Sequence, residues 1–170
     1  FYQNLNLINK LENSEKDISE NVMIADLVRN DLSITAKRNS VKVEELCKVF
    51  TFNNINQMIS TVTSEICQNL SFDKIISSTF PMGSMTGAPK IKSMQLIDKF
   101  EDFNRGIYSG TIGYIDSKNN FDFNVVIRTI IYDQKDHNLS FPVGSAITSE
   151  SDPSIEYEEC IEKLKSVFVF

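Results

Sequence analysis

The stretch Pro81-Met-Gly-Ser-Met-Thr-Gly-Ala-Pro-Lys90 says most about how this chain folds. It stands directly before an amphipathic run, residues 91–100. Glycine permits positive φ and a close approach of the backbone to a ligand, and Pro89 suits the first turn of a helix. The pattern therefore predicts a loop that leads into a helix, whose N-terminal N–H groups could hold an anion. A Gly-Pro turn that only starts a helix would give the same string.

Upstream of this loop, the sequence predicts helices and strands. The Asn-rich opening, through about Ser14, has the composition of a loop or a poorly ordered chain end. Residues 17–32 place apolar side chains on one face of a helix. Residues 41–52 are β-branched and partly alternating, and residues 58–62 have the pattern of a second strand. Residues 72–77 predict a short helix just before the loop.

Downstream of the loop, the hydrophobic period changes to two. Residues 110–116, 121–133 and 139–148 have strand patterns joined by polar turns, which predicts an antiparallel meander. Ser151-Asp-Pro153 then offers an N-cap and a proline near the start of a helix over residues 153–167. The expected core side of this helix consists of Ile155, Ile161, Leu164 and Phe168. Helices on both sides of antiparallel strands indicate a layered α+β fold.

Composition narrows the class of protein. The chain has 170 residues, enough for one domain with a sizeable core, and a net charge of −6, which argues against a nucleic-acid partner. An anionic substrate would need a local cation or oriented backbone donors. No apolar run reaches transmembrane length, so no membrane partner is expected. Cys47, Cys67 and Cys160 show neither disulfide nor zinc spacing, which favours a reducing, cytoplasmic location. The chain begins at Phe1, and we expect it to be part of a longer protein.

Two pairs of carboxylates share one spacing. Asp17 and Glu20 are three residues apart in the first predicted helix, and Glu156 and Glu159 are three apart in the last. Residues at i and i+3 project from one face of a helix. If the two helices face each other, four carboxylates surround a point suited to Mg²⁺, which prefers oxygen ligands. Lys163 follows Glu159 by four residues on the same face. Acidic pairs on a solvated helix surface would show the same spacing.

A possible carboxylate-binding group lies in the strand region. Arg128 stands among apolar β-branched residues, where burial is costly without an anionic partner. Its planar guanidinium can bind a carboxylate ligand through two parallel hydrogen bonds. An exposed arginine on the outer face of an edge strand would explain the same sequence pattern equally well. Backbone N–H groups of Gly144-Ser-Ala146 and the hydroxyl of Tyr108 are candidate further donors. The single histidine, His137, lies in a polar turn and is assigned no chemistry.

Four strings of this sequence, taken together, resemble the C-terminal half of the chorismate-utilising enzymes. This family includes aminodeoxychorismate synthase component I, anthranilate synthase component I, and the isochorismate and salicylate synthases. The strings are Glu20-Asn-Val-Met-Ile-Ala-Asp-Leu-Val-Arg-Asn-Asp31, Pro81 to Lys90, Arg105-Gly-Ile-Tyr-Ser-Gly-Thr-Ile-Gly-Tyr114 with Ile127-Arg-Thr129, and Ser151-Asp-Pro-Ser-Ile-Glu-Tyr-Glu-Glu159. Their order and spacing also match, from about Asp17 to Leu164.

The resemblance implies a fold and a chemistry. The fold would be α+β, a layered α/β sandwich with antiparallel sheets flanked by helices. Residues 1–170 would form the C-terminal portion of a single chorismate-binding domain whose N-terminal half lies outside this chain. The chemistry would be a Mg²⁺-dependent reaction on chorismate, a dicarboxylate with an enolpyruvyl ether. The metal would bind the ring carboxylate and help the C4 hydroxyl to leave.

The resemblance also implies roles for individual residues. Tyr108 and Arg128 match positions that hold the enolpyruvyl carboxylate, Gly144 a glycine of the same pocket, and Thr86 a position that lines the ring site. The implied metal ligands are Asp17, Glu20, Glu156 and Glu159. The two positions with expected catalytic roles are Lys163, near the substrate, and Gln57. Many members of the family have a histidine where Gln57 stands, and glutamine cannot transfer a proton at neutral pH. Ala146 replaces a second pocket glycine.

Within the family, Ser84, Thr86 and Met23-Ile24 are more similar to the aminodeoxychorismate synthases than to the anthranilate synthases. The implied function is that of a transferase that aminates chorismate at C4 to 4-amino-4-deoxychorismate, with ammonia from a glutamine amidotransferase partner. The alternatives are anthranilate synthase, which aminates C2 and expels pyruvate, and a non-catalytic chorismate-binding homologue. The family string Pro-Ile-Lys-Gly-Thr or Pro-Ile-Ala-Gly-Thr belongs upstream of Phe1. We therefore expect residues 1–170 alone to be inactive.

Overall fold

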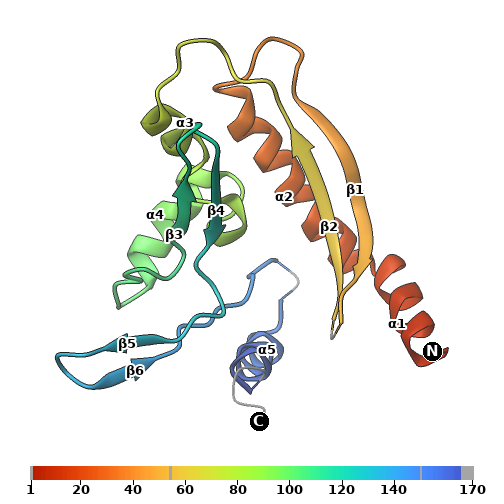
Figure 1. Ribbon diagram of the computed structural model, residues 1–170. Helices are drawn as coiled ribbons and strands as arrows, with labels where there is room; N and C mark the ends of the chain where they lie inside the picture. Colours follow the sequence, from red (N-terminus) through yellow and green to blue (C-terminus); the bar gives the residue numbers. More distant parts are fainter. Residues whose placement is uncertain (1, 54, 150, 166–170) are drawn as a thin grey trace. The chain divides into compact units, whose positions relative to one another are not determined.

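The computed structural model describes residues 2–53, 55–149 and 151–165, which fall into two units, residues 1–102 and 103–170 (Figure 1). In the first unit, helix α2 (Glu15–Ser33) lies beside a hairpin of strands β1 (Lys42–Thr51) and β2 (Asn56–Thr63). The predicted helix and both predicted strands are confirmed; the helix and β2 are slightly longer than predicted, and β1 is one residue shorter at each end. Ala25 of α2 and Met58 of β2 are buried, because the helix packs on the hairpin.

The β1–β2 hairpin is irregular along its first strand. The register of the antiparallel pairing shifts between Val43 and Glu45 and again between Glu45 and Lys48. Cys47, within the second shift, has a φ of +52°. Such bulges bend a strand and increase its twist. The backbone N–H of Cys47 donates to Ser60 Oγ at 2.9 Å across the hairpin.

The opening of the chain differs from the prediction. Residues Tyr2–Glu12 form helix α1, where the Asn-rich composition indicated a loop or a disordered end. Ile8 and Leu11 are half-buried at helical spacing, and the helix contacts both strands of the hairpin. Asparagine is a poor helix former in isolation, but tertiary packing overrides propensity when one face of the helix is covered.

The Pro81–Lys90 loop connects two further helices. Helix α3 (Phe72–Thr79) precedes it, a short 3₁₀ turn, η1 (Gly83–Met85), lies inside it, and helix α4 (Lys90–Phe100) follows. Pro89 is the N-cap of α4, one position before the first helical residue. The predicted order of helix, loop and helix is confirmed.

Gly83 brings this loop against α2. A Cβ added at Gly83 would lie 2.5 Å from Leu27 Cδ2, closer than side chains pack. The residue is buried, and only the absence of a side chain lets the backbone approach the leucine this closely. The glycine therefore serves the packing of the loop on the helix.

The second unit contains two separate hairpins and a helix. Strands β3 (Thr111–Ile115) and β4 (Phe121–Val125) form one antiparallel pair, and β5 (Ile131–Asp133) and β6 (Asn138–Ser140) form the other. The prediction of a three-stranded meander was wrong. The run over residues 121–133 is interrupted at residues 126–130, where Arg128 has a φ of +50°, far from the extended conformation of a regular strand. The third predicted strand, residues 139–148, is regular only in β6.

Helix α5 (Pro153–Lys165) ends the described part of the chain. The Asp152 carboxylate accepts from the N–H groups of Ser154 at 2.8 Å and Ile155 at 3.2 Å, which confirms the predicted cap. The core side was predicted in part wrongly: Ile155 is 65% exposed, whereas Glu156 is only 5% exposed. Phe168 and the predicted last turn, residues 166 and 167, lie outside the described residues. Helices and small antiparallel sheets together confirm the α+β class.

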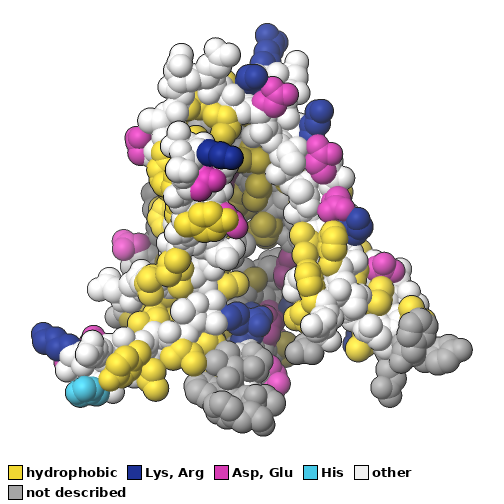
Figure 2. Space-filling model, viewed as in Figure 1, with side chains coloured by type: hydrophobic (Ala, Val, Ile, Leu, Met, Phe, Trp, Pro, Cys, Tyr) yellow, Lys and Arg dark blue, Asp and Glu magenta, His cyan; other side chains and the backbone are white. Residues whose placement is uncertain are grey.

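Large apolar side chains reach the surface in both units. Figure 2 shows hydrophobic side chains on the surface of the β5–β6 hairpin, where Tyr132 and Leu139 are both exposed. Among the described helices, none has the length and apolar content needed to cross a membrane.

Candidate functional site

Glu156 is a buried carboxylate in the first turn of α5. The Ser151 hydroxyl donates to its Oε1 at 2.9 Å, and the Ser145 hydroxyl donates to its Oε2. Both oxygens therefore accept a hydrogen bond from a neighbouring side chain, as a buried carboxylate requires. The helix N-terminus also favours negative charge at this position. Sequence reasoning identified Glu156 but gave neither serine a role toward it.

Glu159 and Lys163 lie one and two turns further along the same helix. The Lys163 ammonium is 2.5 Å from Glu159 Oε1 and donates to the backbone carbonyl of Gly144 at 3.0 Å. The structure thus brings three of the predicted site residues together, Glu159, Lys163 and Gly144. The i, i+4 spacing predicted the contact within the helix, but not the contact with Gly144.

Tyr108, in the turn before β3, also lies next to Gly144. A Cβ added at Gly144 would lie 2.8 Å from the Tyr108 hydroxyl oxygen, so the phenol tip lies directly against this glycine. The Arg105 guanidinium stacks 6.0 Å from the centre of the Tyr108 ring, and its Nη1 donates to Ser109 Oγ at 2.9 Å. Arg105 therefore packs against the Tyr108 ring, a role that the sequence did not reveal.

Arg128 lies in the irregular segment between β4 and β5, with its side chain exposed. The prediction that it stands within a strand was wrong, and it is not buried among the apolar neighbours of that segment. Within the described ranges, its guanidinium makes no hydrogen bond or ion pair. A φ of +50° is costly for a residue with a side chain. Strained residues of this kind concentrate at functional sites.

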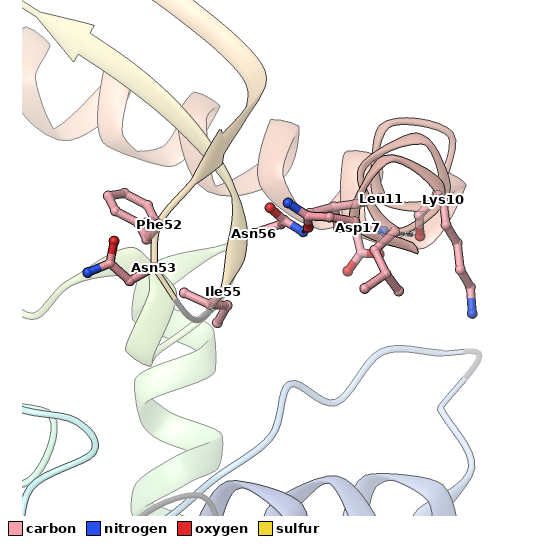
Figure 3. A pocket seen from close by; sticks show the side chains of 10 residues that line it. Lys10, Leu11, Asp17, Phe52, Asn53, Ile55 and Asn56 are labelled. Carbon is pink, nitrogen blue, oxygen red and sulfur yellow. Dashed lines mark hydrogen bonds between the residues drawn. The ribbon is translucent and has the colours of Figure 1, made fainter. Parts of the chain in front are cut away.

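In the first unit, Asp17 and Glu20 lie three residues apart on α2. Asp17 is exposed and lines a groove of about 580 Å³ between α1, the start of α2 and the tip of the β1–β2 hairpin (Figure 3). Its backbone N–H donates to the N-cap hydroxyl of Ser14 at 3.3 Å. Glu20 is half-buried, with Oε1 4.0 Å from the Lys16 ammonium. Asp17 is exposed and lines this groove, which leaves its carboxylate accessible to a cation.

Gln57 lies on β2, opposite Phe50 of β1. Its side-chain amide donates to the Met58 carbonyl at 3.4 Å, and the Asn21 amide donates to the same carbonyl at 3.4 Å. The Ser60 hydroxyl donates to Asn21 Oδ1. Asn21, next to Glu20, thus ties α2 to β2 beside Gln57. Its position within the Glu20–Asp31 string was the only sequence signal for this contact.

Thr86 is turned toward its own loop. Its hydroxyl lies 3.1 Å from the Met82 carbonyl and 3.3 Å from that of Gly83, and its backbone N–H donates to Gly83 at 3.1 Å. The Met85 N–H donates to Met82 at 3.0 Å. Two N–H groups of the loop are therefore occupied by the 3₁₀ turn, so an anion would have to be held by the others.

The candidate metal ligands fit Mg²⁺ by the chemistry of their donors. All four supply carboxylate oxygens, the ligands that this hard cation prefers. No group of three or more His, Cys, Asp or Glu side chains that could hold a metal ion occurs within the described parts of the chain. Each helix, considered by itself, offers two carboxylates, and on α5 one of them is already oriented by two hydroxyl groups.

Comparisons with known proteins identify a family for this chain. The family described as chorismate binding enzyme matches residues 2–169. The chain is 42% identical over 159 residues to a probable chloroplastic aminodeoxychorismate synthase of Oryza sativa subsp. japonica, covering 92% of this chain and 17% of that protein. It is 42% identical over 157 residues to aminodeoxychorismate synthase of Streptomyces griseus, covering 92% of this chain and 21% of that protein. The chain thus spans about a fifth of the length of these relatives.

A solved structure gives the same result for the fold. Anthranilate synthase component I from Streptococcus pneumoniae TIGR4 superposes with a TM-score of 0.85 at 29% sequence identity. The superposition covers 99% of this chain and 38% of that one. Both the α+β fold and the predicted family resemblance are confirmed.

Proposed function

The chain belongs to the chorismate-binding enzyme family, and from this membership we propose that its protein aminates chorismate at C4. The C4 hydroxyl is replaced by an amine, giving 4-amino-4-deoxychorismate and water. The observation that carries this proposal is the 42% identity, over 92% of the chain, to two proteins named aminodeoxychorismate synthase. The proposed activity is that of the whole protein, in which residues 1–170 form one part.

The second unit supports binding of an anionic substrate. Three candidate donors to a carboxylate lie together here. They are the hydroxyl of Tyr108, the backbone N–H of Gly144 and the ammonium of Lys163. The exposed Arg128 guanidinium provides a planar pair of donors for a second interaction of the same kind. A chain with a net charge of −6 repels an anion at long range, so these local donors would supply the attraction.

We propose that the reaction depends on Mg²⁺, with Asp17, Glu20, Glu156 and Glu159 as candidate ligands. The support is the oxygen-only donor set and the buried, doubly hydrogen-bonded carboxylate of Glu156. When bound, Mg²⁺ supplies Lewis-acid stabilisation of negative charge on the substrate. Lys163 remains a candidate catalytic residue, since its ammonium lies beside Gly144. Gln57 can orient a ligand by hydrogen bonding but cannot act as an acid or base.

Three further features belong to the same proposal. A glutamine amidotransferase subunit or domain would supply the ammonia. The protein would be cytoplasmic, as the spacing of its cysteines suggests. Residues 1–170 alone would not turn over chorismate, because the relatives are about five times longer and Ile91 and Ile147 are 73% and 77% exposed here. Soluble, monomeric and active protein of this length would contradict the last point.

Anthranilate synthesis is the second candidate function. The observation that favours it is the superposition with anthranilate synthase component I, at a TM-score of 0.85. That reaction aminates C2 and releases pyruvate, so the two candidates differ in whether the enolpyruvyl group survives. A third candidate, a chorismate-binding homologue without turnover, is favoured by Gln57, which cannot transfer a proton where many relatives have a histidine.

One experiment separates the three. The intact protein is incubated with chorismate, MgCl₂ and ammonium chloride, and the products are identified by mass spectrometry. A product that gains an amine and keeps the enolpyruvyl group supports the proposal. Anthranilate with free pyruvate would establish the second candidate, and chorismate that is bound but unchanged would establish the third.

The metal dependence is tested with matched variants of α5. We expect Glu156→Gln and Glu159→Gln to abolish Mg²⁺-dependent turnover, while Glu158→Gln, an identical change at an exposed position of the same helix, leaves it unchanged. Full activity of both of the first two variants would exclude these carboxylates from the site.

A further inference from the structure

The carboxylate of Glu156 is held by two serines from different parts of the second unit. Ser151 immediately precedes the N-cap of α5, and Ser145 lies in the segment after β6. The Ser151 hydroxyl donates to Oε1 at 2.9 Å, and the Ser145 hydroxyl donates to Oε2. With Glu156 only 5% exposed, these hydroxyl groups replace hydration that the carboxylate would have in water.

The Ser151 hydroxyl oxygen also accepts a hydrogen bond from the backbone, and Thr148 Oγ1 lies 3.3 Å from it. The N–H of Thr148 donates to Ser151 Oγ at 3.0 Å, so this oxygen acts as an acceptor on one side. Its single proton is then available for Glu156 Oε1 on the other side. Hydrogen bonds arranged in such a series strengthen one another. The series therefore sets the position of Oε1 more firmly than an isolated rotating hydroxyl would.

Ser145 connects the glutamate to the predicted substrate position. Its neighbour Gly144 accepts a hydrogen bond from Lys163 at 3.0 Å, and Lys163 is paired with Glu159 at 2.5 Å. The dipeptide Gly144-Ser145 thus contacts α5 twice, once through a carbonyl and once through a hydroxyl. As a result, this dipeptide is linked to both candidate metal ligands of α5. Ser145 contacts Glu156 directly, and Gly144 is linked to Glu159 through Lys163.

We propose that Ser145 and Ser151 are positioning residues, which hold the Glu156 carboxylate in the orientation in which it ligates the metal. This inference rests on the proposed function. A carboxylate oxygen has two lone pairs, so accepting from a hydroxyl leaves it able to ligate a cation. Glutamate has three rotatable side-chain bonds, and the two serines remove that freedom before the metal binds. Partners of this kind are typically worth 10- to 100-fold in metal affinity.

The test is a calorimetric titration of the intact protein with MgCl₂ alone, which measures the Kd for Mg²⁺. We expect Ser145→Ala and Ser151→Ala each to raise the Kd for Mg²⁺ by about tenfold or more. Ser145→Thr and Ser151→Thr keep the hydroxyl and should restore part of the affinity. Ser154→Ala is the matched control, because Ser154 is exposed on the same helix and its hydroxyl makes no hydrogen bond within the described residues.

Melting temperatures in EDTA separate positioning from a purely structural role. If the alanine variants melt earlier but bind Mg²⁺ as the wild type does, the serines only stabilise the fold and the proposal is overturned. If the wild type binds Mg²⁺, Glu156→Gln loses it and the serine variants do not, the positioning role fails while the proposed metal site stands. If the wild type binds no Mg²⁺, the metal site fails, and the positioning role fails with it.

Discussion

The ammonium of Lys90 lies 2.5 Å from Oδ2 of Asp31, in an ion pair whose side chains are only 16% and 8% exposed. Lys90 closes the Pro81–Lys90 loop and starts α4, whereas Asp31 lies near the end of α2, 59 residues earlier. The pair therefore joins two of the four strings that characterise this family in the sequence. It fixes the end of the loop to the helix that carries Asp17 and Glu20.

Removal of either partner should destabilise the first unit strongly. Asp31→Asn and Lys90→Met each leave a largely buried charge without its partner, which typically costs about 3–5 kcal/mol. We expect the double change Asp31→Asn with Lys90→Met to cost clearly less than the sum of the single changes. Urea denaturation provides the measurement. The exposed pair of Arg29 and Asp26, at 2.6 Å, is the control, and Asp26→Asn should cost less than about 1 kcal/mol.

The contact between Gly144 and Tyr108 predicts a coupled pair of variants. In Gly144→Ala, the new methyl group would stand 2.8 Å from the tyrosine hydroxyl and must push it away. We expect chorismate to bind about tenfold more weakly, a loss of about 1.4 kcal/mol. In a Tyr108→Phe background the hydroxyl is absent, so adding Gly144→Ala should cost little more. Strictly additive losses in a calorimetric titration would show that the two residues act independently.

Arg128 should show opposite effects on stability and on binding. Arg128→Gly relieves the φ of +50° and should raise the free energy of unfolding by up to about 1 kcal/mol, while it weakens chorismate binding. Arg128→Ala keeps the strain, so it should weaken binding without that gain in stability. If both variants bind chorismate as the wild type does, Arg128 is an ordinary surface residue.

The turn between β3 and β4 predicts a pH effect. The pKa of Asp116 lies below its usual range, because its carboxylate accepts from the Asn120 side chain and from the N–H groups of Lys118 and Asn120. A lowered pKa in the folded state means that this contribution to stability is present above the unfolded-state pKa. It is lost as the pH falls through the lower, folded-state value.

NMR titration of the Asp116 carboxyl carbon measures this effect directly. Asn120→Ala removes the side-chain donor, which is the largest cause of the shift, and should raise the pKa of Asp116 toward its usual value. The backbone donors of the turn remain in this variant, so the return should be partial. An unchanged titration curve in Asn120→Ala would exclude the side-chain amide as the main cause.

Local patterns of the sequence predicted most elements of the fold. The amphipathic period of residues 17–32 and the cap at Asp152 are local signals, and both were sufficient. Helix α1 was missed because its stability comes from the hairpin that it contacts rather than from its own residues. The strand over residues 121–133 was interrupted by a backbone conformation at Arg128 that hydrophobic alternation does not encode.

The candidate site shows the same division. Glu156, Glu159 and Lys163 share one helix, and their spacing alone placed them on neighbouring turns. The contacts of Ser145 with Glu156 and of Lys163 with Gly144 join residues 11 and 19 positions apart through a bend of the chain. Nothing in the local sequence records such a contact, because it depends on how the segment after β6 returns to α5. The burial of Glu156 in place of Ile155 has the same origin.

The close approach of Gly83 to Leu27 has a consequence for the order in which the chain folds. The 3₁₀ turn docks against Leu27, so we expect α2 to form before the loop is fixed. The contacts of α2 with the β1–β2 hairpin span a shorter stretch of chain and close at a lower entropic cost. We therefore expect the loop that carries Thr86 to become ordered late, after the surface that receives it is complete.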